Sequence, residues 1–359
     1  MSGALFAPPA AALGGKGVGV FFRVIPKSVI PDLVRGLSEQ YEVVGPVAKG
    51  EAFVYAPIED AARLRLDYDT TVLPAKRWFF PESEELMRFR VADNAVMSES
   101  LDTAPRVLFG LHPCDVNSLL LMDNVFLGET PDPYYKARRG NTLIVGVSCM
   151  PNEHCFCDAW GTGETHWGFD IFLTDIGDDY YASIRSVMGA ELVDRYVPCR
   201  AITDEDTAAF QRRAAEFKGA FTNSVDTSQL PVLLDAKFDS EIWDRLGEKC
   251  LGCGACSMVC PTCYCFDVHD ELEADQLHGT RVRTWDSCQF KQFAAVAHGQ
   301  NFRDTRASRV KYRYYHKQWG YLSKFERVLC VGCGRCTRAC KAQINPPRVV
   351  RALQTGVVD

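Results

Sequence analysis

Residues 250–261 read Cys250-Leu-Gly-Cys253-Gly-Ala-Cys256-Ser-Met-Val-Cys260-Pro261, and residues 330–340 read Cys330-Val-Gly-Cys333-Gly-Arg-Cys336-Thr-Arg-Ala-Cys340. Both stretches space their cysteines as C-x2-C-x2-C-x3-C, and this is the one internal repeat that we find in the sequence. We call them the first and the second cysteine run. A large chain that concentrates cysteines in this way is expected to bind a metal or to carry redox chemistry.

The spacing of each run is that of the bacterial ferredoxins, which hold [4Fe–4S] clusters through cysteine thiolates. Three cysteines two residues apart wrap a loop around three corners of the cube, whereas the fourth begins a helix and points away from that loop. Tight turns around a bulky inorganic core need small residues that tolerate positive φ. Each run supplies two glycines for this purpose, namely Gly252, Gly254, Gly332 and Gly334. The sequence therefore predicts two [4Fe–4S] clusters.

In two-cluster ferredoxins the fourth cysteine of each run ligates the other cluster. This rule assigns Cys250, Cys253, Cys256 and Cys340 to cluster 1, and Cys330, Cys333, Cys336 and Cys260 to cluster 2. The link from Cys260 to Cys330 is much longer than that of a simple ferredoxin, and Lys341 departs from the proline of the pattern. The alternative is structural zinc, which usually takes its four ligands from two separated CxxC pairs. Iron–sulfur clusters are favoured because the whole four-cysteine pattern occurs twice without a histidine partner.

Four further cysteines, Cys114, Cys149, Cys155 and Cys157, are grouped in the first half of the chain. Both stretches that carry them follow predicted strands, so we expect them to converge at one edge of a sheet. Their density suggests a third iron–sulfur cluster, although their spacing matches no common motif. The alternative is a set of buried, inert thiols, because free cysteine is readily buried. His112 and His154 are candidate ligands or neighbours of this site.

The other four cysteines carry weaker signals. Cys263 and Cys265 follow the first run directly, and we expect them to pack beside a cluster; tuning or shielding it, or replacing a ligand, are the alternatives. Cys288 in Trp-Asp-Ser-Cys is equally open, and Cys199 is expected to be a small buried apolar residue. Neither the spacing of these four cysteines in the sequence nor the residues next to them decide which of these roles each one has.

The composition limits the functional class. The chain has 359 residues, 16 cysteines and a net charge of −6, and 11 of the cysteines lie between residues 250 and 340. So acidic a chain is not built around nucleic acid as its partner. No stretch approaches the roughly 18 continuous apolar residues of a membrane span. The segment 1–22 lacks a basic region ahead of an apolar core, so we interpret it as a lead-in to a first strand rather than as a secretion signal. Together with free thiols, this predicts a cytoplasmic protein.

The predicted fold class is α+β. A mixed α/β domain is expected at residues 1–235, and a mainly helical, ferredoxin-like domain with a long insertion between the cysteine runs at 236–359. Short β-rich stretches predict strands at 18–24, 106–111 and 142–148. Helices are predicted at 203–221, which opens on Thr203 with acidic residues in its first turn, and at 240–249 and 289–298. The polar segment 222–237 is predicted to be a linker.

A basic stretch lies between the two runs. It is interleaved with Tyr312, Tyr314 and Tyr315, and its cations are Arg303, Arg306, Arg309, Lys311, Arg313, Lys317, Lys324 and Arg327. Nucleic acid or an acidic partner would be one explanation. Because the chain is acidic overall, we favour a solvated face that offsets negative thiolate clusters, or a surface for a protein partner.

Several motifs, taken together, resemble one protein family. They are Phe109-Gly-Leu-His-Pro-Cys-Asp115, Asp132-Pro-Tyr-Tyr135, Phe156-Cys-Asp-Ala-Trp-Gly-Thr-Gly163, Gly168-Phe-Asp170, Cys260-Pro-Thr-Cys-Tyr-Cys-Phe-Asp267, Trp285-Asp-Ser-Cys288 and Cys330-Val-Gly-Cys-Gly-Arg-Cys336. The pattern, over roughly residues 60–345, is similar to the 4Fe–4S dicluster proteins, which include the beta subunit of soluble nickel–iron hydrogenases (sulfhydrogenases) and one of the subunits of anaerobic sulfite reductase. His112 stands where that pattern leads us to expect arginine, so we give this position no role.

The resemblance implies a non-catalytic electron-transfer subunit of a multi-subunit oxidoreductase. Such a subunit sits between a subunit that carries flavin and handles NAD(P)H and a catalytic or further relay subunit of the hydrogenase, sulfite reductase or heterodisulfide-reductase type. The competing hypothesis is a reductase with its own active site, built on the four cysteines of the first half. The sequence does not select the terminal donor or acceptor.

Overall fold

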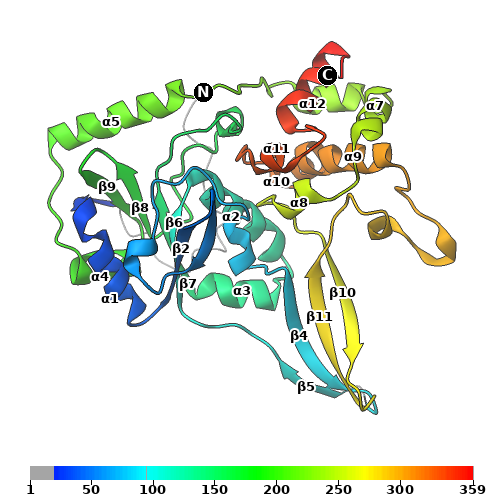
Figure 1. The fold of residues 1–359 in the computed structure, drawn as a ribbon, viewed down its shortest axis with the longest axis horizontal. Helices are drawn as coiled ribbons and strands as arrows, with labels where there is room; N and C mark the ends of the chain where they lie inside the picture. Colours follow the sequence, from blue (N-terminus) through cyan, green and yellow to red (C-terminus); the bar gives the residue numbers. More distant parts are fainter. Residues whose placement is uncertain (1–19, 94, 359) are drawn as a thin grey trace.

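The computed structural model describes residues 20–93 and 95–358, and Figure 1 shows how its elements are arranged. The strands are β1 Phe21–Pro26, β2 Glu42–Lys49, β3 Ala52–Pro57, β4 Ser83–Arg90, β5 Ala95–Glu99, β6 Arg106–Leu111, β7 Thr142–Val147, β8 Ile171–Asp175, β9 Asp179–Ile184, β10 Phe266–Leu272 and β11 His278–Trp285. The helices are α1 Ile30–Ser38, α2 Pro113–Phe126, α3 Pro133–Gly140, α4 Val187–Tyr196, α5 Asp204–Gly219, α6 Leu230–Ala236, α7 Ile242–Lys249, α8 Ala255–Met258, α9 Arg306–Tyr315, α10 Tyr321–Phe325, α11 Arg335–Ala339 and α12 Pro346–Thr355.

The first half is built on a seven-stranded mixed sheet with the order β1-β9-β8-β7-β6-β2-β3. The pairs β2–β6, β6–β7 and β7–β8 are parallel, and the outer pairs are antiparallel. Parallel strands at the centre of a sheet are normally covered on both faces and are therefore apolar along their whole length. Strand β6 follows this rule, since all six of its residues are buried.

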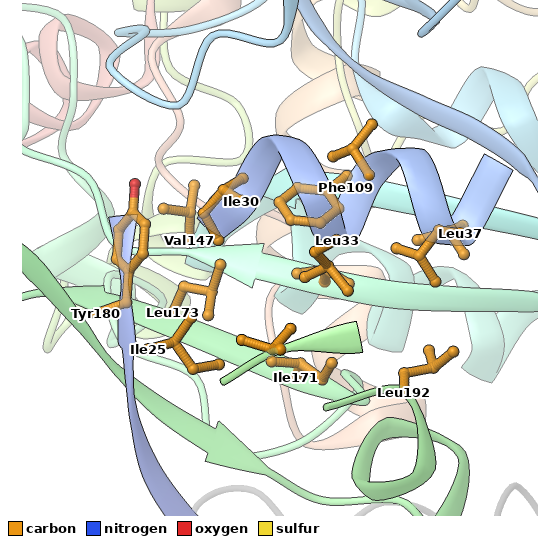
Figure 2. Close-up of a cluster of buried hydrophobic side chains, with 14 of the residues drawn as sticks. Ile25, Ile30, Leu33, Leu37, Phe109, Val147, Ile171, Leu173, Tyr180 and Leu192 are labelled. Carbon is orange, nitrogen blue, oxygen red and sulfur yellow. The ribbon is translucent and has the colours of Figure 1, made fainter. Parts of the chain in front are cut away.

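The two faces of this sheet pack against different helices. On one face, Ile30, Leu33 and Leu37 of α1 lie over strand residues such as Val147 and Leu173, as Figure 2 shows. On the other face, residues of α2 and α3 pack in a second core that includes Leu108 and Ile144 of β6 and β7. Because side chains alternate along a strand, neighbouring residues of β6 serve opposite cores. The loops that follow the carboxyl ends of the parallel strands lead to the candidate site.

A second, four-stranded sheet has the order β10-β11-β4-β5. It combines a hairpin from the first half of the chain with one from the segment between the cysteine runs, and it extends away from the body of the molecule (Figure 1). All seven residues of its edge strand β10 are exposed. This sheet joins segments that are far apart in sequence, and the start of β10 lies directly after the first run.

The C-terminal part is otherwise helical. Its apolar core is formed by α6, α7, α9 and α12, which supply Trp243, Val310, Tyr314, Val349 and Leu353, among others. Helix α9 continues through a π-helical turn, His316–Gly320, into α10. Both cysteine runs lie beside this helical core, so α9 is placed to present side chains to each of them.

Most predicted elements agree with the structure within a few residues. Strands β1, β6 and β7 and helix α7 are found where the sequence predicts them, and helix α5 begins after Thr203, whose side chain forms a capping box with Asp206. The lead-in at residues 1–19 lies outside the described residues.

Two predicted elements are wrong. The predicted linker contains helix α6, because Leu230 and Leu234 are buried in the helical core. The predicted helix at 289–298 is two short 3₁₀ turns, and it is interrupted at His298 and Gly299, which both have positive φ.

Candidate iron–sulfur centres

A cavity lies beside the first run and is lined by Cys250, Cys253, Cys256 and Cys340. Three of these cysteines come from the first run, and Cys340 reaches the cavity from the end of the second. Apolar side chains of the helical core, including Val310, close the cavity from one side. Backbone N–H groups already approach two of the sulfurs, since Gly252 N donates to Cys250 Sγ (3.4 Å) and Ile344 N to Cys340 Sγ (3.3 Å).

A second cavity is lined by Cys330, Cys333, Cys336 and Cys260. All four of these cysteines are buried, whereas Cys253 of the first cavity is exposed. The two cavities therefore differ in solvent access, and a negative charge in the second is screened less by water and salt.

The local backbone explains why the two cavities resemble each other. Helices α8 and α11 both begin after a glycine in the left-handed region, Gly254 (φ 73°) and Gly334 (φ 75°), and the two helices contact each other. Gly252 (φ 66°) and Gly332 (φ 61°) make the preceding turns. These are the four positive-φ glycines that the run sequences predict. Four thiols around a cavity, with a loop of this kind, fit a [4Fe–4S] group.

The sulfur spacing argues against zinc. A tetrahedral site with Zn–S distances of about 2.3 Å needs sulfurs roughly 3.8 Å apart. Within residues 20–93 and 95–358, only Glu273, Asp275 and His278 form a group of three or more potential ligands with their atoms all within 4.8 Å of one another. That group contains no cysteine and lies at the tip of the exposed hairpin, so the cysteine sets are too widely spaced for a preformed zinc site.

Buried cations surround the two cavities. Arg313 is 4% exposed and lines both of them, and its guanidinium donates to Cys256 O at 3.5 Å. Lys317 is 2% exposed, and its ammonium donates to Cys260 Sγ (3.4 Å) and Thr262 Oγ1 (2.7 Å). The prediction of a solvated basic face is wrong for these side chains and for Arg309, because α9 and the turn after it direct them inward. Arg309, Arg313 and Lys317 nevertheless lie where their positive charge offsets the negative charge of the thiolates.

The four cysteines of the first half also come together. Cys114 is in the first turn of α2, and Cys149 follows β7 by two residues. Cys155 lies in the next loop, and Cys157 begins the 3₁₀ turn Cys157–Trp160. Burial, together with the charges of Cys149 and Cys155, raises the pKa of Cys157, and the charges of Cys157 and Cys333 contribute to the raised pKa of Cys114. The loop with Cys157 lies directly against the second run, since a Cβ on Gly332 would be 2.5 Å from Cys157 Cα.

The loop that carries Cys155 and Cys157 packs directly on the second run. Phe156 N donates to Gly332 O (2.9 Å), and Thr162 Oγ1 donates to Val331 O (2.7 Å). His112 is 2% exposed, stacks on Tyr68 with 4.0 Å between ring centroids, and has no hydrogen-bond partner at Nε2 among the described residues. Burial lowers the pKa of His112 to about 4, so its ring is neutral. His154 is half-buried at the rim of a separate, basic pocket.

Some residues at these sites gave no usable signal in the sequence. Lys76 is 2% exposed and lies against the segment after the first run, yet a single lysine in Pro-Ala-Lys-Arg-Trp has no local feature that marks it. Asp115 is completely buried and pairs with Arg335 of the second run. Cys199, which the sequence predicts to be buried, is half-buried and packs against the edge of the first core.

Comparison with known proteins agrees with this geometry. Residues 249–344 match the family described as 4Fe-4S dicluster domain. The chain is 37% identical over 329 residues to the sulfhydrogenase 2 subunit beta of Pyrococcus furiosus, and the alignment covers 91% of this chain and 97% of that protein. No solved structure matches the chain. In the part of the chain that the structure describes, no helix has the length and apolar character needed to span a membrane.

Proposed function

Because the chain belongs to the family of the sulfhydrogenase beta subunit, we propose that it relays electrons between a subunit that binds flavin and handles NAD(P)H and a catalytic subunit of a multi-subunit oxidoreductase. It carries a 4Fe–4S dicluster domain and is an iron–sulfur subunit of the hydrogenase type. The number of clusters, their ligands and the partners are part of the proposal.

The observation that carries the proposal is that each of the two cavities is lined by four cysteines, three from one run and the fourth from the other. We assign Cys250, Cys253, Cys256 and Cys340 to cluster 1 and Cys330, Cys333, Cys336 and Cys260 to cluster 2. When bound, such clusters supply one-electron transfer. The chain's own residues hold the sulfurs in place, exclude water from the second cavity and offset negative charge with Arg313 and Lys317.

The relation between the two cavities supports a relay. Arg313 lines both, and helices α8 and α11 touch each other. Electrons that enter one centre therefore have a short protein path to the other.

The test is a metal and sulfide analysis of the full chain purified without oxygen. We expect at least about eight irons and eight acid-labile sulfides per chain, the content of two cubes, and EPR signals from the reduced protein. Fewer irons, or zinc without sulfide, would contradict the proposal.

The surface near cluster 1 supports contact with a partner. Cys253 is exposed, and Cys340 also lines a pocket whose cations are Arg338, Lys341, Arg348 and Arg351. A cationic rim beside a redox centre favours an acidic partner surface, since complementary charge accelerates association. Purification from native cells is expected to yield the cytoplasmic complex with its companion subunits, and these identify the reaction.

We extend the proposal to a third cluster at Cys114, Cys149, Cys155 and Cys157. Their convergence next to Cys333 would place it beside cluster 2. Substituting Cys149→Ser is expected to remove about four irons per chain, whereas Cys199→Ser, at a cysteine of the apolar core, should remove none. An equal iron content in both variants would restrict the relay to two clusters.

A second candidate function, reduction of a small molecule at the first-half cysteines, is favoured by one cavity. It is lined by Cys149, Arg185 and Arg213 together with the aromatic rings of Phe172 and Phe217. Cations and aromatic rings beside a redox site suit an anionic or planar acceptor. Turnover by the isolated chain with an artificial donor, abolished by Arg213→Gln, would support this function. Strict dependence on partner subunits would count against it.

A further inference from the structure

The outer strand of the four-stranded sheet has a free edge. Strand β10 (Phe266–Leu272) is the last strand in the order β10-β11-β4-β5, and among the described strands it pairs with β11 alone. All seven of its residues are exposed, and the sheet carries the strand away from the body of the molecule (Figure 1). The side of β10 that faces away from β11 is therefore open to another chain.

The hydrogen bonds at the two ends of the hairpin show which backbone groups face this open side. Asp286 N donates to Cys265 O at 2.9 Å, and Glu273 N donates to His278 O at 3.0 Å. The register between β10 and β11 is continuous from one end to the other. In an antiparallel ladder, directly bonded pairs alternate with pairs that share no bond. The odd-numbered residues of β10 are therefore bonded to β11, and the N–H and C=O groups of its even-numbered residues point outward.

The outward backbone groups belong to Phe266, Val268, Asp270 and Leu272. A row of unpaired donors and acceptors is a template for a further strand, and natural proteins block such edges with proline, a β-bulge, a covering segment or charged side chains, lysine above all. Strand β10 contains no proline and no lysine, and its pairing with β11 has no bulge. Its charged side chains are mainly acidic, so they deter only strands of like charge.

The two faces of β10 differ in chemistry. Val268 and Leu272 are 41% and 60% exposed, and they lie on one face because side chains alternate along a strand. Asp267 and Glu271 lie on the other face, with His269 between them as their shared partner. Neither carboxylate forms an ion pair with a lysine or an arginine among the described residues. A strand added at this edge would therefore meet apolar side chains on one face and unneutralised acidic side chains on the other.

We propose that β10 binds an extended segment of a partner subunit in which lysine or arginine alternates with apolar residues. The proposal rests on the multi-subunit function proposed above and adds the chemistry of one partner surface to it. The added strand forms main-chain hydrogen bonds to the outward groups of Val268 and Asp270. Its cations lie beside Asp267 and Glu271, and its apolar side chains cover Val268 and Leu272. This surface is opposite in charge to the cationic pocket near cluster 1, so the two select different partner surfaces.

A second copy of this chain is the competing occupant of the edge. Two β10 strands that pair antiparallel over their whole length are centred on His269, and this register places Asp267 of each copy opposite Glu271 of the other. Like charges directly opposite each other destabilise a strand pair. The acidic side chains of β10 thus keep two copies apart and favour a cationic strand.

Hydrogen exchange at single-amide resolution tests the proposal on the wild-type chain. In the complex purified with its companion subunits, the outward amides of Val268 and Asp270 are expected to exchange at least about tenfold more slowly than in the isolated chain. The amides of Asp267, His269 and Glu271 are bonded within the hairpin, so their exchange should differ much less. One companion segment with alternating lysine or arginine should gain protection as well. Equal exchange of Val268 and Asp270 in the complex and in the isolated chain would overturn this proposal alone.

Substitutions separate the contribution of the backbone from that of the charge. Val268→Pro removes an outward N–H at an edge position where proline is tolerated, and it should weaken binding of the full chain to its companion subunits at least about tenfold. Val268→Thr retains the N–H and should bind like the wild type. Glu271→Lys should weaken binding at least about fivefold. Glu59→Lys makes the same change of charge at an exposed residue outside the hairpin and should have no effect.

The iron content of these variants serves as the folding control. It should equal that of the wild type, because β10 carries none of the proposed cluster ligands. Binding of Val268→Pro to the companion subunits as tightly as the wild type would overturn the proposal. A dimer of the isolated chain that Val268→Pro abolishes would overturn the choice of occupant in favour of a second copy. A wild-type chain that purifies from native cells without companion subunits would overturn the proposed function as well.

Discussion

The guanidinium of Arg335 donates a hydrogen bond to Asp115 Oδ2 across 2.8 Å, and both side chains are buried. Arg335 lies between two cysteines of the second run, and Asp115 lies in the first turn of α2, next to Cys114. The same guanidinium also donates to Thr71 O at 3.0 Å. One buried ion pair thus fastens the cysteine loop of the C-terminal part to the carboxyl end of the central sheet.

Removing the carboxylate should destabilise the protein strongly. Asp115→Asn leaves the Arg335 charge buried without its counter-ion, and we expect a loss of about 3–5 kcal/mol in the free energy of unfolding. Denaturant titration followed by far-ultraviolet circular dichroism measures it. Asp69→Asn is the matched control, because Asp69 pairs with Arg338 and both are more than 40% exposed, so it should cost about 1 kcal/mol or less. Equal losses of unfolding free energy in the two variants would contradict the role of Asp115 as the buried counter-ion of Arg335.

Close packing of the first-half loop on the second run predicts a large effect at Gly332. A Cβ at this residue would lie 2.5 Å from both Cys157 Cα and Phe156 O, which are backbone atoms that cannot rotate away. Gly332→Ala is therefore expected to lower both the melting temperature and the iron content. At Gly299, φ is also positive (73°) but nothing lies within 4 Å, so Gly299→Ala isolates the backbone strain, about 1–2 kcal/mol. If Gly332→Ala behaves like this control, the loop does not pack as described.

The position of Arg313 predicts an effect on reduction potentials. A buried positive charge favours the reduced, more negative form of a nearby cluster. Arg313→Gln should therefore make the potentials of both clusters more negative by tens of millivolts or more, in an EPR-monitored redox titration. Lys311→Gln removes the same charge from the same helix, but from its outer side near Asp239, and should change neither potential measurably. A shift confined to one cluster would show that Arg313 serves only one cavity.

The exchange of the fourth cysteine between the runs predicts a pattern of iron loss. Cys250→Ser combined with Cys340→Ser removes two ligands of one cluster, so the double variant should lose no more than about four irons. Cys250→Ser combined with Cys260→Ser affects both clusters, and the loss should be about twice as large. Iron and sulfide analysis of proteins prepared without oxygen provides the measurement. If the variant with Cys340→Ser instead loses about twice as much iron as the variant with Cys260→Ser, each run ligates its own cluster.

Several features follow from local sequence. The positive-φ glycines and short helices of the runs are dictated by residues that are close neighbours along the chain, as is the cap at Thr203. The buried strands β6 and β7 are identified by continuous apolar stretches. Segment 289–298 could not be predicted in this way because its backbone is held by long-range contacts, such as the bond from Gln289 Nε2 to Arg309 O at 2.9 Å.

The amino-acid sequence alone determined the ligand type and the loop geometry, since C-x2-C-x2-C-x3-C places thiols and glycines at fixed steps along a short backbone. Only the tertiary structure decided which distant groups meet those loops: Cys340 at the first cavity, Lys76 beside Cys263, and Asp115 against Arg335. The spacing of residues along the chain determines only contacts within one or two turns. The three contacts just named join segments that are far apart in the sequence. They depend on how the helical core and the two sheets pack, because burial of a charge is favourable only where folding brings its partner.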